Sequence, residues 1–281
     1  MSQSKQSKHR HISFTAHYTG YIWYQMGISH EAFATKKGKK LAQLIGPIET
    51  FAEKYVGGSM RSTLKTRHTI LDEYLTQLIQ EHPDLQVLEI AAGLSPRGWW
   101  FRNHFPQIEY RELDLPDMAA TKQAALNAIS PDHPQVLSVD LFTEDFQTAF
   151  DVFDTQRPLV IVSEGLINYF NKELLEQLLS SISKFGKPFK ALHYLTDLYP
   201  EPVHHKLANL IWTSSKLLKY ASRSSFSFHF KNPLEVTEFF KKSEFKTVSV
   251  VQPQLHFGSD KTIVETEDHL GDLVWVVHAQ R

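Results

Sequence analysis

Short apolar runs of strand length recur through the last two thirds of the chain, and segments of helical length separate most of them. The expected strands are 86–91, 108–115, 135–141, 158–164, 189–195, 246–252 and 272–279. The helices expected between the first five strands lie near 96–105, 117–129, 143–151 and 171–185. Parallel strands need crossover connections, so this alternation predicts an α/β fold with right-handed βαβ units and a mostly parallel seven-stranded sheet with helices on both faces. The last two strands lack a clear helix between them and are expected to form an antiparallel pair at the end of the sheet.

The N-terminal part of the chain has a different pattern of residues. Aromatic residues and glycines alternate from residue 11 to about 55, and Gly38 and Gly46 are expected to break this part into short helices. Apolar residues at helical spacing then predict an amphipathic helix over about 60–80.

These patterns suggest a division of the chain into parts. Residues 1–10 are polar and basic, which predicts a disordered tail. Residues 11–82 would form a helical lid, and residues 83–281 would form the α/β domain. Residues 199–232 interrupt the alternation and predict a helical insertion after the fifth strand.

The composition excludes several classes of protein. The 281 residues include 42% hydrophobic and 22% charged residues and carry a net charge of −1, so neither nucleic acid nor an anionic membrane is an expected partner. The chain has no cysteine, which excludes disulfides, thiolate nucleophiles and cysteine-based metal sites. No secretory signal and no apolar run long enough for a bilayer are recognisable, so we expect a soluble, cytoplasmic protein. The oligomeric state is left open.

The segment VLEIAAGLSPRGWWF, residues 87–101, is the most informative one. A buried strand that carries Glu89 leads into the small-residue turn Ala91 to Gly93, and Pro96 suits the first turn of a helix. The chain lacks the dinucleotide fingerprint and the phosphate-binding loop. A carboxylate beside the turn disfavours a pyrophosphate and favours a cationic ligand such as S-adenosylmethionine, which carries an ammonium and a sulfonium. A tight turn with a solvated Glu89 is the alternative.

Acidic residues recur at the expected ends of the first four strands. They are Glu89, Asp114, Asp140 and Glu164. An acid about 20 residues after the first turn is where ribose hydroxyls are bound in such folds, which fits Asp114. Asp140 could accept a hydrogen bond from an adenine amino group.

Three motifs together resemble those of the leucine carboxyl methyltransferase family and its bacterial relatives, the polyketide-type O-methyltransferases. The motifs are VLEIAAGLSPRG, YRELDLPDM with Lys122 after it, and SEGLINYF, and the opening HISFTAHYTGYIW is similar to the start of bacterial members. The resemblance covers roughly residues 11–281. It implies a Rossmann-like class I fold with a helical lid that uses S-adenosylmethionine and releases S-adenosylhomocysteine.

The resemblance also implies roles for individual residues. The implied cofactor contacts are Arg67 at the cofactor carboxylate, Ala91 and Gly93 in the turn, Asp114 at the ribose, Asp140 and Leu141 at the adenine, and Glu164 near the methionine end. Tyr169 closes the segment that begins at Glu164. The lysine that protein-methylating members place before their G-Y-W segment is missing, with Ser13 near that position, and this favours a small-molecule acceptor.

The acceptor and the catalytic base are harder to predict. Tyr18 and Tyr21 could line a lid around the sulfonium, and His229 could reach the acceptor from the insertion, although the tyrosines could equally form the core of a helical subdomain. His193, expected near the carboxyl end of the fifth strand, and Tyr169 are the candidate bases, and a buried structural histidine is the alternative for His193.

The expected activity is S-adenosylmethionine-dependent methyl transfer to a carboxylate or hydroxyl oxygen of a small molecule. No metal is expected, because no H-E-x-x-H motif or other ligand spacing occurs. A cofactor-binding protein without turnover, a protein carboxyl methyltransferase and an unrelated α/β enzyme such as a dehydrogenase stay open as alternatives.

Overall fold

A computed structural model of the chain describes residues 13–56, 60–201, 226–257 and 273–281. The predicted disordered tail and most of the predicted insertion, residues 202–225, lie outside the described residues.

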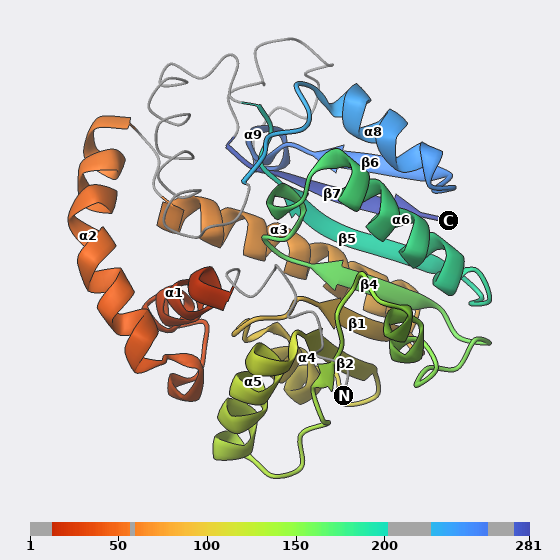
Figure 1. Ribbon diagram of the computed structural model, residues 1–281, viewed down its shortest axis with the longest axis horizontal. Helices are drawn as coiled ribbons and strands as arrows, with labels where there is room; N and C mark the ends of the chain where they lie inside the picture. Colours follow the sequence, from red (N-terminus) through yellow and green to blue (C-terminus); the bar gives the residue numbers. More distant parts are fainter. Residues whose placement is uncertain (1–12, 57–59, 202–225, 258–272) are drawn as a thin grey trace, which may run out of the picture.

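The described strands form one seven-stranded sheet in the order β3-β2-β1-β4-β5-β7-β6 (Figure 1). The strands are β1 (Gln86–Ile90), β2 (Glu109–Asp114), β3 (Leu137–Ser138), β4 (Leu159–Ser163), β5 (Leu192–Leu198), β6 (Thr247–Val251) and β7 (Trp275–Gln280). The pairs among β1 to β5 are parallel, and β7 runs antiparallel to both β5 and β6. This confirms the predicted mostly parallel sheet and its antiparallel end.

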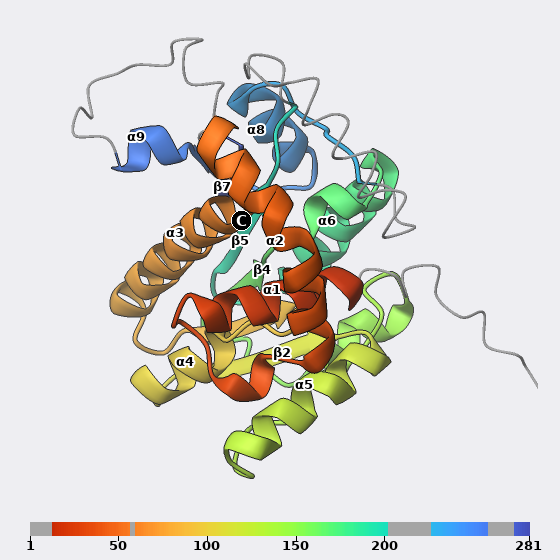
Figure 2. The ribbon, with the colours of Figure 1, turned by 90° about the vertical axis from the view of Figure 1, so that its left-hand side faces the viewer.

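The helices between the first five strands match the expected crossovers, whereas α8 and α9 were not predicted; short 3₁₀ helices are labelled η. The described helices are α1 (Ser13–Gln25), η1 (Glu31–Phe33), α2 (Lys36–Val56), α3 (Met60–Glu81), α4 (Arg97–His104), α5 (Pro116–Ile129), η2 (Glu144–Ala149), η3 (Ile167–Tyr169), α6 (Lys172–Gly186), α8 (Pro233–Lys242) and α9 (Pro253–Phe257). Figures 1 and 2 show α1 and α2 beside the carboxyl ends of the parallel strands, apart from the helices that cover the sheet. Among the described helices, none is both long enough and apolar enough to cross a membrane.

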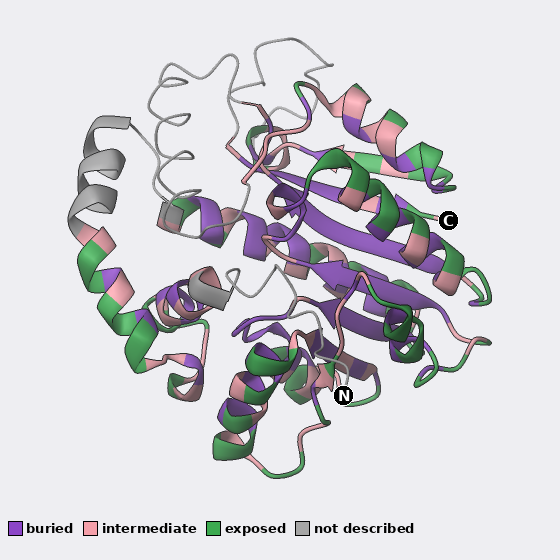
Figure 3. Cartoon of the chain, in the orientation of Figure 1, coloured by how far each residue is buried: buried purple, intermediate pink, exposed green. Residues whose placement is uncertain are grey.

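Alternate residues of β1 supply the two layers of the core. Leu88 and Ile90 belong to a cluster that includes apolar residues of α6 and α8, whereas Val87 belongs to a second cluster with residues of α3 and α4. Both clusters are buried, and the strands form the buried centre of the molecule in Figure 3.

Helix α3 covers the sheet as well as leading into it. Its residues Ile70, Leu71 and Leu75 are fully buried in the same cluster as Val160 and Val276 of the sheet. A domain boundary after residue 82 would therefore separate this helix from the strands against which it packs. The proposed division into lid and α/β domain stays a prediction.

Helix α2 does not break at its glycines, so the expectation of short helices is wrong here. The helix continues through Gly38 and Gly46. A Cβ atom on Gly38 would lie 2.1 Å from the carbonyl oxygen of His17 in α1, whereas a Cβ at Gly46 would meet no atom of another described element within 4 Å. Gly38 is thus the residue that allows α1 and α2 to pack closely.

We predict opposite effects of alanine at these two glycines. Gly38→Ala forces α1 away from α2 and should lower the free energy of unfolding by about 2–3 kcal/mol. Gly46→Ala, the matched control in the same helix, should raise it by up to about 1 kcal/mol, because alanine favours helix. Urea unfolding measures both, and equal effects of the two variants would contradict the close helix contact.

The structure does not support His193 as a catalytic base. His193 is the second residue of β5 and pairs with Val160 near the start of β4, at the amino ends of the parallel strands. Its Nδ1 lies 3.0 Å from Nε2 of His278, and burial, followed by the proximity of His278 and His82, lowers the pKa of His193 to about 4. Four residues, or about 13 Å of strand, separate it from Asp197 at the carboxyl end.

This buried histidine predicts a pH dependence of stability. Between pH 6.5 and about 4 the unfolded chain binds a proton at His193 that the folded chain does not, so the free energy of unfolding should fall as the pH falls through this window. The loss attributable to His193 is on the order of 3 kcal/mol. Urea unfolding at a series of pH values should show a flatter dependence for His193→Gln, and an unchanged slope would show that His193 is readily protonated in the folded state.

Candidate functional site

The carboxyl ends of the parallel strands bring several acidic residues to one edge of the sheet. Asp114 ends β2, Glu164 follows β4 directly, and Asp197 is the last but one residue of β5. Asp140 lies two residues beyond β3. In open α/β sheets this edge is where ligands bind.

The turn after β1 has a backbone shape that small residues permit. Ala91 and Gly93 have positive φ values of 51° and 50°, and a Cβ on Gly93 would lie 3.1 Å from Cβ of Ala16 in α1. The ammonium group of the buried Lys122 donates to the carbonyl of Ala92 at 3.2 Å. Lys122 of α5 therefore holds the turn, and Ala16 of α1 covers it.

Asp114 connects the second strand to this turn. Its Oδ2 accepts from the backbone N–H of Gly93 at 2.7 Å, and its Oδ1 accepts from the N–H of Leu115 at 2.7 Å. Burial raises the pKa of Asp114, and these two hydrogen bonds oppose the rise. Because each carboxylate oxygen has two acceptor positions, each keeps one for a ligand hydroxyl.

Two arginines and a histidine surround Glu164. Its Oε1 accepts from Nε of Arg67 at 2.9 Å, and its Oε2 accepts from Nη2 of Arg97 at 2.6 Å. Nδ1 of His68 also lies 2.9 Å from Oε2. Burial alone would raise the pKa of Glu164, but His68, Arg97 and Arg67 outweigh it and hold that pKa well below its usual range.

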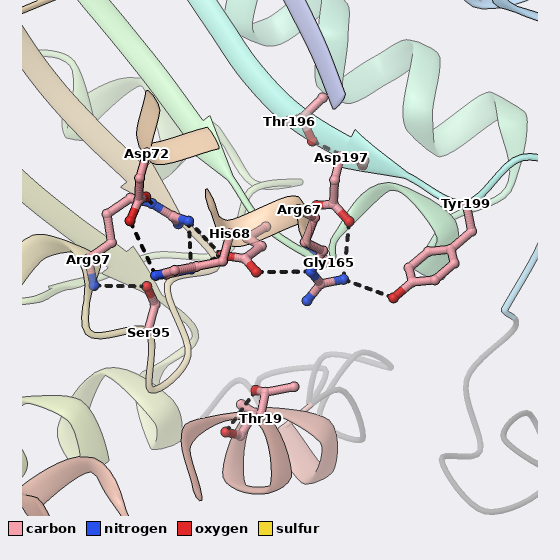
Figure 4. A network of polar contacts seen from close by, with 12 residues as sticks. Thr19, Arg67, His68, Asp72, Ser95, Arg97, Gly165, Thr196, Asp197 and Tyr199 are labelled. Carbon is pink, nitrogen blue, oxygen red and sulfur yellow. Dashed lines mark hydrogen bonds and ion pairs between the residues drawn. The ribbon is translucent and has the colours of Figure 1, made fainter. Parts of the chain in front are cut away.

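Arg67 reaches beyond Glu164 to the end of β5. Its Nη1 lies 3.1 Å from Oδ2 of Asp197 and 3.2 Å from the hydroxyl of Tyr199 (Figure 4). A Cβ atom at Gly165 would meet Nη2 of Arg67 at 2.9 Å, so the glycine leaves room for the guanidinium. Burial raises the pKa of Asp197, and Arg67 opposes the rise.

Glu89 lies on the predicted strand, and its side chain is paired within the protein. The side chain is 1% exposed, and its two oxygens accept from Nη1 of Arg97 at 3.1 Å and from the hydroxyl of Tyr110 at 2.9 Å. Glu89 therefore contributes charge to the site through Arg97 of α4, and its direct contact with the cofactor stays a prediction.

The described network carries an excess of negative charge. Its members are the carboxylates of Asp72, Glu89, Glu164 and Asp197, the guanidinium groups of Arg67 and Arg97, and the imidazole of His68. Four carboxylates outweigh two guanidinium groups whatever the charge of the imidazole. Such a site attracts a cationic ligand and repels a pyrophosphate.

The remaining predicted cofactor residues differ in their surroundings. Asp140 is half-buried, and its Oδ1 accepts from the backbone N–H of Phe142 at 3.0 Å. Leu141 is buried in the main hydrophobic cluster. The third strand is shorter than predicted because the chain turns at Asp140, whose carbonyl accepts from the N–H of Thr143. The adenine-side role of both residues stays a prediction.

Tyr169 lies close to the charged network and touches the N-terminal helix. Its hydroxyl donates to Oγ1 of Thr15 at 3.3 Å, which joins η3 to α1. Burial raises the pKa of Tyr169, so the phenol is protonated at neutral pH and can donate but not act as a base.

The other predicted acceptor residues pack mainly on the protein itself. Tyr18 is buried in a cluster with Ile22 and Leu64, and Tyr21 packs against this cluster. Nε2 of His229 donates to the carbonyl of Phe170 at 2.7 Å, and burial lowers the pKa of His229. Substrate binding by these three residues stays a prediction.

Sequence reasoning assigned no role to four members of the charged network. Asp197 follows the same rule as the other acids, since it lies at the end of a parallel strand, and the segment FKALHYLTD contained that signal. The roles of Asp72, His68 and Arg97 had no comparable signal, because only folding brings α3 and α4 to Glu164. Among the described residues, no group of three histidine, aspartate or glutamate side chains is arranged to hold a metal ion.

Comparisons with known proteins identify methyltransferases as relatives of this chain. Tetracenomycin polyketide synthesis O-methyltransferase TcmP of Streptomyces glaucescens is 29% identical over 113 residues, which cover 40% of this chain and 39% of the relative. A protein of Mycolicibacterium gilvum named "Putative S-adenosyl-L-methionine-dependent methyltransferase" is 31% identical over 128 residues, 43% of this chain and 42% of the relative. The chain thus matches about two fifths of the length of these curated relatives.

A solved structure from Thermobifida fusca, described as a putative methyltransferase, has the same fold. It superposes with a TM-score of 0.62 at 13% identity and covers 93% of this chain and 94% of its own. The sequence model described as leucine carboxyl methyltransferase matches residues 30–183. Because this match spans more than half of the 281 residues, the chain belongs to the leucine carboxyl methyltransferase family.

Proposed function

We propose that this protein is an S-adenosylmethionine-dependent O-methyltransferase that acts on a small-molecule acceptor. The observation that carries the proposal is the negatively charged network at the carboxyl edge of the sheet, beside the turn that Asp114 holds. A cationic nucleoside fits this combination, because the carboxylate can accept from ribose hydroxyls while the network attracts the positive charge. Family membership supports methyl transfer, and the printed name of the Mycolicibacterium gilvum relative supports this cofactor.

The residues present fit the two ends of this cofactor. The free acceptor positions of Asp114 suit the ribose, and Arg67 suits the amino-acid carboxylate because its planar guanidinium offers several donors. Glu164 and Asp197 hold Arg67 in place through Nε and Nη1. Asp140, at the neighbouring strand end, is our candidate for the adenine side.

S-adenosylmethionine, when bound, supplies a methyl group that its sulfonium already activates. The protein therefore contributes mainly orientation and the exclusion of water. Helix α1 serves the second task, since Ala16 covers the turn at Gly93 and Thr15 contacts Tyr169. Trp23 of the same helix lies against His68, with ring centroids 5.4 Å apart, and extends this cover to the charged network.

A carboxylate acceptor needs the fewest assumptions. A carboxylate is ionised at neutral pH and attacks without a base. Of the two predicted bases, Tyr169 is protonated and His193 lies at the opposite edge of the sheet. A hydroxyl acceptor is the second candidate, with His229 as its base, because Nδ1 of this histidine can accept a proton while Nε2 donates to Phe170.

The cofactor site predicts a selective effect of one carboxylate. Asp114→Ala should weaken the binding of S-adenosylhomocysteine by about 1.5–3 kcal/mol, because it removes the acceptor for both ribose hydroxyls. Glu109→Ala, at the other end of the same strand and half exposed, is the matched control and should bind like the parent. Isothermal titration calorimetry measures both. Equal binding by Asp114→Ala and the parent would place the ribose elsewhere.

The stability of the methylated product in alkali distinguishes a carboxylate acceptor from a hydroxyl acceptor. We expect that incubation with methyl-labelled S-adenosylmethionine and a panel of small aromatic and aliphatic carboxylic acids and phenols yields labelled methyl esters. Mild alkali releases labelled methanol from an ester but not from a methyl ether. A product that keeps its label in alkali would instead support the hydroxyl acceptor, and His229→Asn should then reduce its rate of formation.

A further inference from the structure

We propose that Arg97 is a positioning residue that sets the geometry of the amino-acid end of the cofactor site. In this role it orients Glu164, and through Glu164 it orients Arg67. This inference rests on the proposed cofactor. It concerns a residue that lies within the motif VLEIAAGLSPRG but to which the sequence analysis gave no role.

Arg97 joins three parts of the fold at one guanidinium. It is fully buried in the first turn of α4. Its Nε donates to Asp72 of α3 at 2.6 Å, its Nη1 to Glu89 of β1 at 3.1 Å, and its Nη2 to Glu164 at 2.6 Å. An arginine is suited to this place, because a planar fork with five donors can bind three carboxylates at once and a lysine ammonium cannot reach all three.

The two arginines share Glu164 through opposite oxygens. Arg97 binds Oε2, and Nε of Arg67 binds Oε1. A carboxylate held on both sides cannot rotate without breaking a buried ion pair, so Arg97 fixes the plane in which Arg67 lies. Without the bond from Arg97, Oε2 would keep the contact with His68 as its one remaining hydrogen bond to the described residues.

Replacing Arg97 should weaken the binding of the amino-acid end of the cofactor and leave the binding of the ribose end unchanged. The chain has separate supports for the turn at the ribose end, where Asp114 binds Gly93 and Lys122 binds Ala92. None of the hydrogen bonds of Arg97 goes to these residues. Its backbone N–H binds the hydroxyl of Ser95, and its side chain binds Asp72, Glu89, Glu164 and His68. The affinity for a ligand that lacks the amino-acid part should therefore not change when Arg97 is replaced.

The test compares two ligands by calorimetry. S-adenosylhomocysteine has the amino-acid part, and 5′-methylthioadenosine has the same nucleoside and thioether without it. Arg97→Lys keeps the positive charge, and we expect it to weaken S-adenosylhomocysteine at least about tenfold while 5′-methylthioadenosine changes less than about twofold. Arg102→Lys is the matched control, because Arg102 lies in the same helix and forms a buried ion pair with Glu112 at 2.8 Å. It should leave both affinities unchanged.

The outcomes separate this inference from the proposed function. A parent protein that binds neither ligand contradicts the proposed cofactor itself. A parent that binds both, with an Arg97→Lys variant that loses both equally or loses neither, overturns the positioning role. Should Arg97→Lys unfold, Asp72→Asn replaces it, since the Asp72 side chain is 28% exposed and holds Nε of Arg97. The same selective loss is expected there, and unchanged binding of S-adenosylhomocysteine would overturn the inference.

Discussion

The structure depends on the pairing of a single buried carboxylate, that of Glu164, with two buried arginines. An unpaired charge in this place would cost several kcal/mol, so the fold is most stable when the three groups meet. Arg67 comes from α3, Arg97 from α4, and Glu164 follows β4. The ion pairs therefore fix two helices of one face against the carboxyl edge of the sheet. The ion pairs that offset the cost of burying the Glu164 carboxylate also bring the residues of the site together.

The two ends of the site are built on different physical principles. At the ribose end, backbone N–H groups of a tight turn orient Asp114 and leave its outer acceptor positions free. At the other end, ion pairs orient Arg67, and the surrounding acids leave an excess of negative charge. Helix α1 lies over both ends, through Ala16 at the turn and Trp23 at His68. A nucleoside with a charged tail matches this asymmetry, and a dinucleotide with a pyrophosphate does not.

Hydrophobic periodicity predicted the sheet and its antiparallel end, because strand length and strand spacing are local properties of the chain. The errors came from boundaries and from tertiary contacts. Strand β5 begins at Leu192, three residues later than predicted, and this shift moves His193 from the carboxyl end to the amino end. Glu89 lies on the predicted strand, but spacing alone does not reveal its partner, Arg97. The helix break expected at Gly38 was wrong because this glycine serves the close contact between α1 and α2, which is a tertiary property that local spacing does not reveal.

A crystal structure of the protein with S-adenosylhomocysteine would show whether this site binds the cofactor in the proposed orientation. We expect the ribose hydroxyls on Asp114 and the amino-acid carboxylate on Arg67, with Arg67 and Arg97 still bound to opposite oxygens of Glu164. A nucleoside bound away from Asp114, or an amino-acid end that makes no contact with Arg67, would contradict the proposed orientation.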